Sequence, residues 1–245
     1  MLQLGSVRVY HQLAMRKTTV VSLGGSIVVP RAIDTEFLGA FVERIRTRLE
    51  MNPSWRLALV IGGGATARQY QQAARELATE CPPQTQDRIG IAATRINAEL
   101  VRAVFGDLCP DPVVTDPTQP GVVTGSVVVA GGWKPGFSTD NVAVRLAESL
   151  GASTLINLSN IAQVYTADPR TDASAKPLSK VSWEEFTRIV GDEWTPGKNT
   201  PFDPVATKRA AALRMKVIAA DGRDLANLEA ILDGGAFTGT TVGPD

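Results

Sequence analysis

Short apolar runs that end at glycines alternate along this chain with longer segments of helical periodicity. The apolar runs are rich in β-branched residues, which is typical of buried strands in a parallel sheet. Such strands are predicted at 18–23, 57–61, 127–130, 154–158 and 217–219. Between them, apolar residues recur three or four positions apart, as on one face of a helix. Helices are predicted at 34–49, 66–79, 89–105, 140–150, 183–190, 203–214 and 225–232. This alternation predicts the α/β class, with a mostly parallel central sheet and helices on both faces in a three-layer α/β/α sandwich.

Local residue patterns mark where several of these helices begin and end. Asp34 and Asp203 are typical N-cap residues, and a proline follows Asp203 at the first helical position. Ser182 and Glu185 form the pattern of a capping box. The prolines at 82–83 are expected to end the second predicted helix, because proline cannot continue the hydrogen-bonded ladder.

Three parts of the chain give weaker patterns. Residues 109–125 hold four prolines and two glycines, so at most a short strand at 112–115 is expected there. The β-branched residues 240–242 predict a last strand at the edge of the sheet. Residues 1–17 are expected to be a leader that can be disordered, followed by a single domain over 18–245. Polar residues at 10–12 interrupt the leader, which argues against a secretory signal.

The amino-acid composition argues against several classes of protein. The 245 residues include 25 basic and 25 acidic side chains, one His and two Cys, and 44% of them are hydrophobic. This balance argues against intrinsic disorder and against a protein that binds nucleic acid through excess positive charge. Two cysteines cannot form a disulfide framework, and a single His argues against a His-rich metal site or a Ser-His-Asp triad. The apolar runs are too short to span a membrane. We therefore expect a cytoplasmic protein without a nucleic-acid or membrane partner.

Glycine clusters follow three of the predicted strands, at 24–25, 62–64 and 131–132. In open α/β sheets, ligands bind beyond the carboxyl ends of the strands. Glycine lets backbone N–H groups approach an anion closely, and the next helix adds a favourable dipole. A single cluster is more often a tight turn than a binding site. Three clusters in parallel positions instead favour a polyanionic ligand or two phosphorylated ligands.

Two known phosphate-binding patterns fit poorly. Residues 191–199 resemble a P-loop but have one residue too many and Asn199 in place of the hydroxyl. Gly62, Gly64 and Ala67 match the dinucleotide pattern G-x-G-x-x-A, which would suggest an oxidoreductase. That pattern requires an acidic residue about 20 positions later, at the end of a strand. Asp87 lies near that distance but leads into a predicted helix, which weakens the oxidoreductase hypothesis.

Several polar residues near the glycines have two possible roles. Arg68 lies one turn into a predicted helix, where it can reach a phosphate or simply face solvent. Asp140 can cap its helix or orient Mg²⁺ or a basic side chain. Lys208 can be a solvent-facing lysine or part of the site. Ser159, Tyr165 and Asp168 cluster after the strand at 154–158, where Asp168 and the next proline can also form a turn.

An ordered set of sequence blocks resembles the amino acid kinase family, and within it most closely the archaeal-type uridylate (UMP) kinases. The blocks are VVSLGGSIVVP (20–30), VIGGGATARQY (60–70), IGIAATRINAEL (89–100), GGWKPGFSTD (131–140), SNIAQVYTADPRTD (159–172), DPVATK (203–208) and DGRD (221–224). The resemblance implies a single α/β/α domain that transfers a phosphoryl group from ATP·Mg²⁺ to UMP. It also implies a homo-oligomer, usually a hexamer, with small-molecule nucleotides as ligands.

The resemblance assigns roles to individual residues. ATP would be bound by Gly24, Gly25, Ser26, Gly64, Arg68, Ser159, Tyr165 and Asp168. UMP would be bound by Gly63, Asp87, Trp133, Lys134, Pro135, Gly136, Phe137, Ser138 and Thr139. Arg68, Asp140 and Lys208 would be catalytic, with Arg68 and Gly64 where the two ligands meet. No protein ligand to a metal is expected, because Mg²⁺ would be carried with the nucleotide.

Two regions depart from the usual family pattern. Ser22 stands where many relatives carry Lys, two residues before the first glycine. Ala162 and Gln163 stand where relatives commonly carry Asp and Gly. These departures keep open an alternative, a non-catalytic nucleotide- or anion-binding protein of the same fold, used for storage or regulation.

Overall fold

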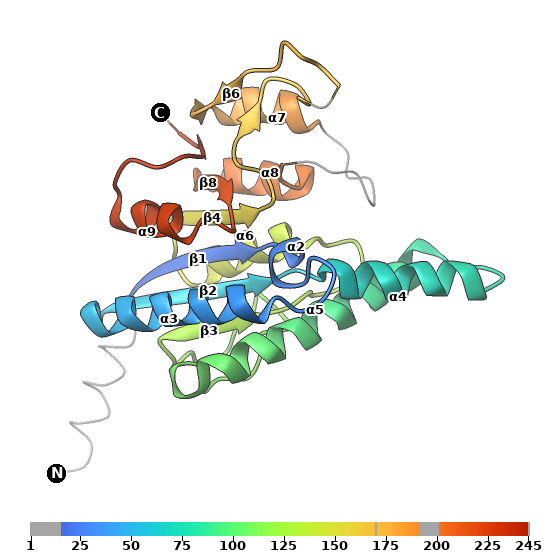
Figure 1. The fold of residues 1–245 in the computed structure, drawn as a ribbon, viewed down its shortest axis with the longest axis horizontal. Helices are drawn as coiled ribbons and strands as arrows, with labels where there is room; N and C mark the ends of the chain where they lie inside the picture. Colours follow the sequence, from blue (N-terminus) through green and yellow to red (C-terminus); the bar gives the residue numbers. More distant parts are fainter. Residues whose placement is uncertain (1–15, 170, 192–200, 245) are drawn as a thin grey trace.

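The computed structural model describes residues 16–169, 171–191 and 201–244, and within them a seven-stranded sheet is central (Figure 1). The strand order is β3-β2-β1-β4-β8-β9-β7. The strands are β1 (Lys17–Leu23), β2 (Trp55–Ile61), β3 (Val127–Ala130), β4 (Thr154–Ser159), β7 (Lys180–Val181), β8 (Lys216–Asp221) and β9 (Thr240–Val242). All neighbours are parallel except β8 and β9. A separate antiparallel pair joins β5 (Val164–Tyr165) to β6 (Pro177–Leu178).

Helices cover both faces of the sheet, as the alternation of strands and helices predicts (Figure 1). One core contains residues of α2 (Gly25–Val28), α3 (Thr35–Met51), α4 (Gly64–Leu77), α5 (Pro83–Phe105) and α9 (Leu225–Asp233). The other core contains residues of α6 (Thr139–Ser149), α7 (Trp183–Val190) and α8 (Pro204–Ala212). A short 3₁₀ turn, η1 (Gly106–Leu108), follows α5. The α/β/α sandwich is therefore confirmed.

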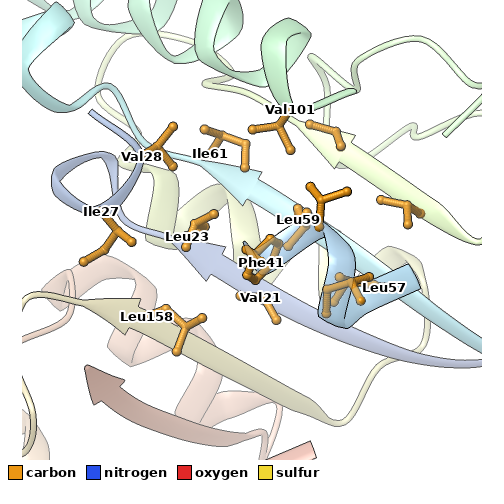
Figure 2. Packing of buried hydrophobic residues seen from close by; sticks show 14 of the residues in the cluster. Val21, Leu23, Ile27, Val28, Phe41, Leu57, Leu59, Ile61, Val101 and Leu158 are labelled. Carbon is orange, nitrogen blue, oxygen red and sulfur yellow. The ribbon is translucent and has the colours of Figure 1, made fainter. Parts of the chain in front are cut away.

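The central strands are buried on both faces, which explains their continuous apolar sequence. All seven residues of β2 are buried. Successive side chains of β1 point to opposite faces, so that Val20 packs in one core and Val21 in the other. Figure 2 shows the core on the Val21 side, where Leu59 of β2 lies near Phe41 of α3 and Ile61 lies near Val28 of α2. This packing fixes the carboxyl ends of β1 and β2, from which the first two glycine clusters emerge.

The predicted helix caps are confirmed in the structure. Asp34 accepts a hydrogen bond from the Phe37 backbone N–H, and Asp203 accepts one from Ala206. Ser182 accepts one from the Glu185 N–H, as the capping box predicts.

Three sequence predictions on elements need correction. Residues 240–242 form a strand, but it lies between β8 and β7 and is not an edge. The segment 112–115 makes only an isolated bridge from Val114 to Ala130. Helix α4 ends at Leu77, before the prolines, and α5 begins at Pro83 where 89 was expected. Proline at a first helical position is favourable because its missing N–H would have no partner there. Most of the predicted 1–17 leader lies outside the described residues, but Lys17 already belongs to β1.

Candidate active site

The three glycine clusters lie at one edge of the sheet. They follow the carboxyl ends of β1, β2 and β3, which are neighbouring parallel strands. The first two clusters touch through their backbones. An added Cβ would lie 2.0 Å from the Gly64 nitrogen if built on Gly25, and 2.2 Å from the Gly25 nitrogen if built on Gly62. Gly64 also has a φ of +60°, which side chains rarely allow. Only glycines permit this close packing of two turns.

The second glycine turn leads directly into α4. Gly63 is the N-cap of α4, and no side chain caps this end among the described residues. Uncapped N–H groups and the helix dipole favour an anion at such a position. The turn is held from behind by Asn97 of α5, whose amide donates to the carbonyls of Gly62 at 2.9 Å and Gly63 at 3.1 Å. Sequence reasoning missed Asn97, although a buried polar residue on the apolar face of a predicted helix was a usable sign.

Arg68 and Ser26 lie around the two glycine turns. The exposed Arg68 side chain donates from Nη2 to the Pro30 carbonyl at 3.1 Å, so it reaches from α4 toward the segment after α2. The Ser26 carbonyl accepts a hydrogen bond from Arg223 at 3.3 Å. Arg223 also lies 3.6 Å from the Asp34 carboxylate. The structure thus brings Arg223, from the DGRD block, beside the first glycine turn, a position that sequence reasoning did not assign.

The third glycine cluster opens a loop over residues 131–138, which we call the 131–138 loop. Helix α5 anchors it at several points. Thr94 Oγ1 accepts from the Gly132 N–H at 2.7 Å. Arg95 donates to the carbonyls of Gly132 at 3.0 Å and Trp133 at 2.9 Å. Asp87 Oδ2 accepts from the Gly136 N–H at 2.8 Å. Asp87 and the loop were both predicted to bind one ligand, and the structure brings them together.

A cavity of about 510 Å³ lies between α5 and this loop. Its lining residues are Arg88, Ile91, Ala92, Arg95, Trp133, Lys134 and Pro135. The three charged side chains in this lining are cations, and the aromatic ring of Trp133 can pack against a planar group. A cavity with these residues can bind a ligand that combines a ring with hydrogen-bond acceptors or negative charge.

Asp140 connects three elements at the centre of the site. Its Oδ1 accepts from the Ser22 hydroxyl of β1 at 3.1 Å, and its Oδ2 accepts from the Asp203 N–H at the start of α8 at 3.2 Å. Asp140 does not cap α6, since Ser138 does so by accepting from the Asn141 N–H at 3.2 Å. The capping role considered for Asp140 is therefore wrong, and its carboxylate instead connects β1 to the start of α8.

Burial is the main cause that raises the pKa of Asp140, to about 6. The neighbouring Asp203 carboxylate raises this pKa further through like-charge repulsion. Hydrogen bonds from Ser22 and from the Asp203 backbone act in the opposite direction because they stabilise the ionised form. A carboxyl group with a shifted pKa that contacts β1 and follows the 131–138 loop is a candidate functional residue.

A second cavity, of about 600 Å³, lies beyond the carboxyl end of β4. It is lined by 160–163, 165–169, 188–190 and Pro201, and thus includes Tyr165 and Asp168. Ser159 directly precedes this lining and accepts from the Ile161 N–H at 3.2 Å. Because the sheet order is β3-β2-β1-β4, this cavity and the one beside the 131–138 loop lie on opposite sides of the two packed glycine turns. The arrangement suits two ligands that meet at these turns.

Lys208 is exposed on α8, a little over one turn after Asp203. The described part of the chain contains no group of three or more His, Cys, Asp or Glu side chains that could hold a metal ion. No described helix is long and apolar enough to cross a membrane.

Comparison with known proteins defines the family. The model of the amino acid kinase family matches residues 17–221, and the chain belongs to this family. A uridylate kinase from Methanospirillum hungatei JF-1 is 40% identical over 92% of this chain and 94% of that protein. One from Pyrococcus abyssi is 34% identical over 92% of this chain and 99% of that protein. The crystal structure of uridylate kinase from Archaeoglobus fulgidus matches with a TM-score of 0.77 at 33% identity, covering 92% of this chain and 99% of that one.

Proposed function

We propose that this chain is an ATP:UMP phosphotransferase, which transfers the γ-phosphoryl group of ATP to UMP and gives UDP for pyrimidine nucleotide synthesis. The pair of cavities on either side of the two packed glycine turns carries this proposal, because a kinase must place two nucleotides with their phosphates together. The similarity to uridylate kinases over nearly the whole chain supports it further.

The cavity beyond β4 fits the donor nucleotide. Tyr165 and Asp168 line it and would contact the adenosine part of ATP, next to Ser159. The phosphates would then extend to Gly24, Gly25 and Ser26, where backbone groups can approach closely. Gly64 and Arg68 lie at the neighbouring turn and would meet the γ-phosphate.

The cavity beside the 131–138 loop fits the acceptor nucleotide. Trp133, Lys134 and Pro135 line it, and Asp87 fixes the loop through Gly136. The loop ends with Phe137 and Ser138, and Thr139 is the first residue of α6. The phosphate of UMP would extend toward Gly63 and the start of α4, where the helix dipole favours an anion.

The transfer itself requires alignment and charge neutralisation more than covalent catalysis. An oxygen of the UMP phosphate attacks the γ-phosphorus, the bond to the bridging oxygen of ADP breaks, and ADP leaves with that bond's electrons. Arg68 and Lys208 would neutralise the charge that moves during this step. Asp140 would orient the cationic partners of the phosphates. Mg²⁺ neutralises the ATP phosphates when it is bound with the nucleotide. A carboxylate at Asp140 fits a Mg²⁺ ion that would be held mainly by the substrate phosphates and waters.

ADP release from ATP·Mg²⁺ tests the function directly in a coupled assay. UMP, CMP, AMP and no acceptor are compared at equal concentration. UMP is expected to give the fastest release, with little release when no acceptor is added. Release that depends on another monophosphate would keep the kinase and change the acceptor. Binding of ATP or UMP in calorimetry without any release would reject the kinase in favour of the storage or regulatory alternative.

The raised pKa of Asp140 predicts that the activity falls at low pH, and we call the pH at which kcat falls to half its maximum the acid limit. If the ionised carboxylate is the active form, kcat should fall as the pH drops through about 6, where the Asp140 pKa lies. Ser22→Ala removes a hydrogen bond that lowers this pKa, so the limit should move to higher pH. Asp203→Asn removes the repulsion that raises it, so the limit should move to lower pH.

Each shift should be a few tenths of a pH unit to one unit, because one unit corresponds to about 1.4 kcal/mol. In Asp203→Asn, the new asparagine can still act as the N-cap of α8. Profiles of kcat against pH from 5 to 8 measure both shifts. Movement of the two limits in the same direction would contradict the role given to Asp140.

We further propose a cytoplasmic homo-oligomer, a hexamer in keeping with the family resemblance, formed by one domain over 18–245. Large exposed apolar side chains on α4 and α5 support self-association, namely Tyr70, Leu77, Ile96 and Val104. Light scattering on a sizing column would measure the mass of the assembly.

A further inference from the structure

Two aromatic and two cationic side chains, Trp133, Lys134, Phe137 and Arg145, gather at the 131–138 loop, and we call them the aromatic–cation cluster. The ring centroids of Trp133 and Phe137 lie 4.8 Å apart. Lys134 Nζ lies 3.9 Å from the Trp133 centroid and 5.2 Å from that of Phe137. Arg145 Cζ lies 5.3 Å and 5.2 Å from the same two centroids. Each cation is thus within the range in which an aromatic ring attracts it.

Arg145 is the member of the cluster that does not belong to the loop. It lies on α6, and its Nε donates to Asn141 Oδ1 at 2.8 Å. Asn141 is only 1% exposed, and its backbone N–H donates to Ser138. The guanidinium therefore has a fixed place relative to the start of α6. Lys134 is exposed and belongs to the loop itself, and its charge also acts on the Asp116 carboxylate outside the loop, whose pKa it lowers.

The surroundings of Arg145 favour contact with aromatic rings. Arg145 is partly buried, which lowers its pKa, and repulsion from the nearby Arg209 lowers this pKa further. Arg209 is itself paired with Glu148 of α6. A guanidinium stays charged at all ordinary pH values. Partial desolvation strengthens its attraction to the rings of Trp133 and Phe137.

We propose that Arg145 is a positioning residue for the acceptor nucleotide: it holds the Trp133–Phe137 pair, and with it the 131–138 loop, in the conformation that shapes the acceptor cavity. This inference rests on the proposed function, because it assigns that cavity to UMP. Asp87 and Arg95 anchor the loop from α5, and Arg145 anchors it from α6. None of the four cluster residues lines the cavity beyond β4, so ATP binding does not depend on this anchor.

Arg145→Ala should raise KM for UMP about fivefold to tenfold, the size of one or two partly desolvated cation–π contacts. KM for ATP and kcat should change by less than about twofold, within the scatter of ordinary surface substitutions. Arg145→Lys should recover part of the UMP affinity, since it keeps the charge but not the planar group that also bonds Asn141. Arg44→Ala is a matched control, because Arg44 lies on α3 and pairs with Glu229 of α9. It should change none of these constants.

Hydrogen exchange of the backbone amides of 133–138, measured without nucleotides, tests the anchor independently of activity. Arg145→Ala should speed this exchange, above all at Gly136, whose N–H is bound to Asp87. If the wild-type protein does not phosphorylate UMP, the proposed function fails while the exchange result still decides the anchoring role. Unchanged exchange with unchanged KM would overturn the proposal. A large loss of kcat with unchanged KM would also overturn it, because Arg145 would then act on the transferred group.

Discussion

Asp140→Asn is expected to lower kcat by a factor on the order of 10² to 10³, the usual cost of removing one charged group that organises a transition state. The amide can keep both observed contacts, since its oxygen can accept from the Asp203 N–H and its NH₂ group can donate to Ser22. The substitution therefore removes the charge and little else. Single-turnover rates of UDP formation at pH 7.5 would measure the loss.

The Asp140→Asn protein should be at least as stable as the wild-type protein. The folded-state pKa of Asp140 is raised to about 6, so folding favours the protonated form. The resulting penalty is absent at pH values below the unfolded pKa, grows as the pH rises toward 6, and is fully present above 6. A shift of about two units corresponds to roughly 2–3 kcal/mol, which Asn would relieve in part. Denaturant unfolding at pH 7.5 and pH 4.5 should show a gain for the variant at both values, and the gain should be clearly smaller at pH 4.5, where only part of the penalty remains.

Asp224→Asn is the matched control for this experiment. Asp224 caps α9 by accepting from the Asn227 N–H, and Asn is an equally good N-cap. This variant should keep both the turnover and the stability of the wild-type protein. A wild-type rate for Asp140→Asn would remove Asp140 from the catalytic groups. Loss of both rate and stability would show instead that its charge supports the fold.

The sheet and its helices could be predicted because their causes are local. Continuous apolar runs such as β2 indicate strands buried on both faces, and caps such as Asp34 fix where helices begin. Strand neighbours are not local information. Residues 240–242 were predicted to form an edge strand, but this strand, β9, lies between β8 and β7 and pairs with both. Strands as short as β5, β6 and β7, with two residues each, carry too little periodicity to be recognised.

The site could be predicted only in part for the same reason. Glycines after three strands predicted that the three clusters would meet at one edge of the sheet, and they do so because parallel strands bring their carboxyl ends together. The contacts of Asn97 with Gly62 and of Asp140 with Ser22 span many residues, and no sequence spacing reveals them. Ser22 looked like a missing lysine, but its hydroxyl is a partner of Asp140. The departure at this position therefore has a structural role and does not by itself argue against catalysis.

Arg68→Ala is expected to lower kcat/KM for UMP by about 10² to 10³, because an arginine that neutralises phosphoryl charge contributes strongly to such transfers. Arg68 is exposed, and its side chain donates to the Pro30 carbonyl, so the fold should lose little from its removal. Arg68→Lys should restore a small part of the rate, since a point charge lacks the planar pair of donors that fits a phosphate.

Arg75→Ala provides the control on the same helix. Arg75 lies two turns further along α4 and bonds the side chains of Gln72 and Gln86, away from the glycine turns. It should keep the wild-type kcat/KM, and both alanine variants should melt close to the wild-type temperature. Equal losses in the two variants would point to damage to α4 as a whole. A wild-type rate for Arg68→Ala alone would exclude this side chain from phosphoryl transfer, and Lys208 would then have to neutralise the moving charge, which Lys208→Ala would test in the same assay.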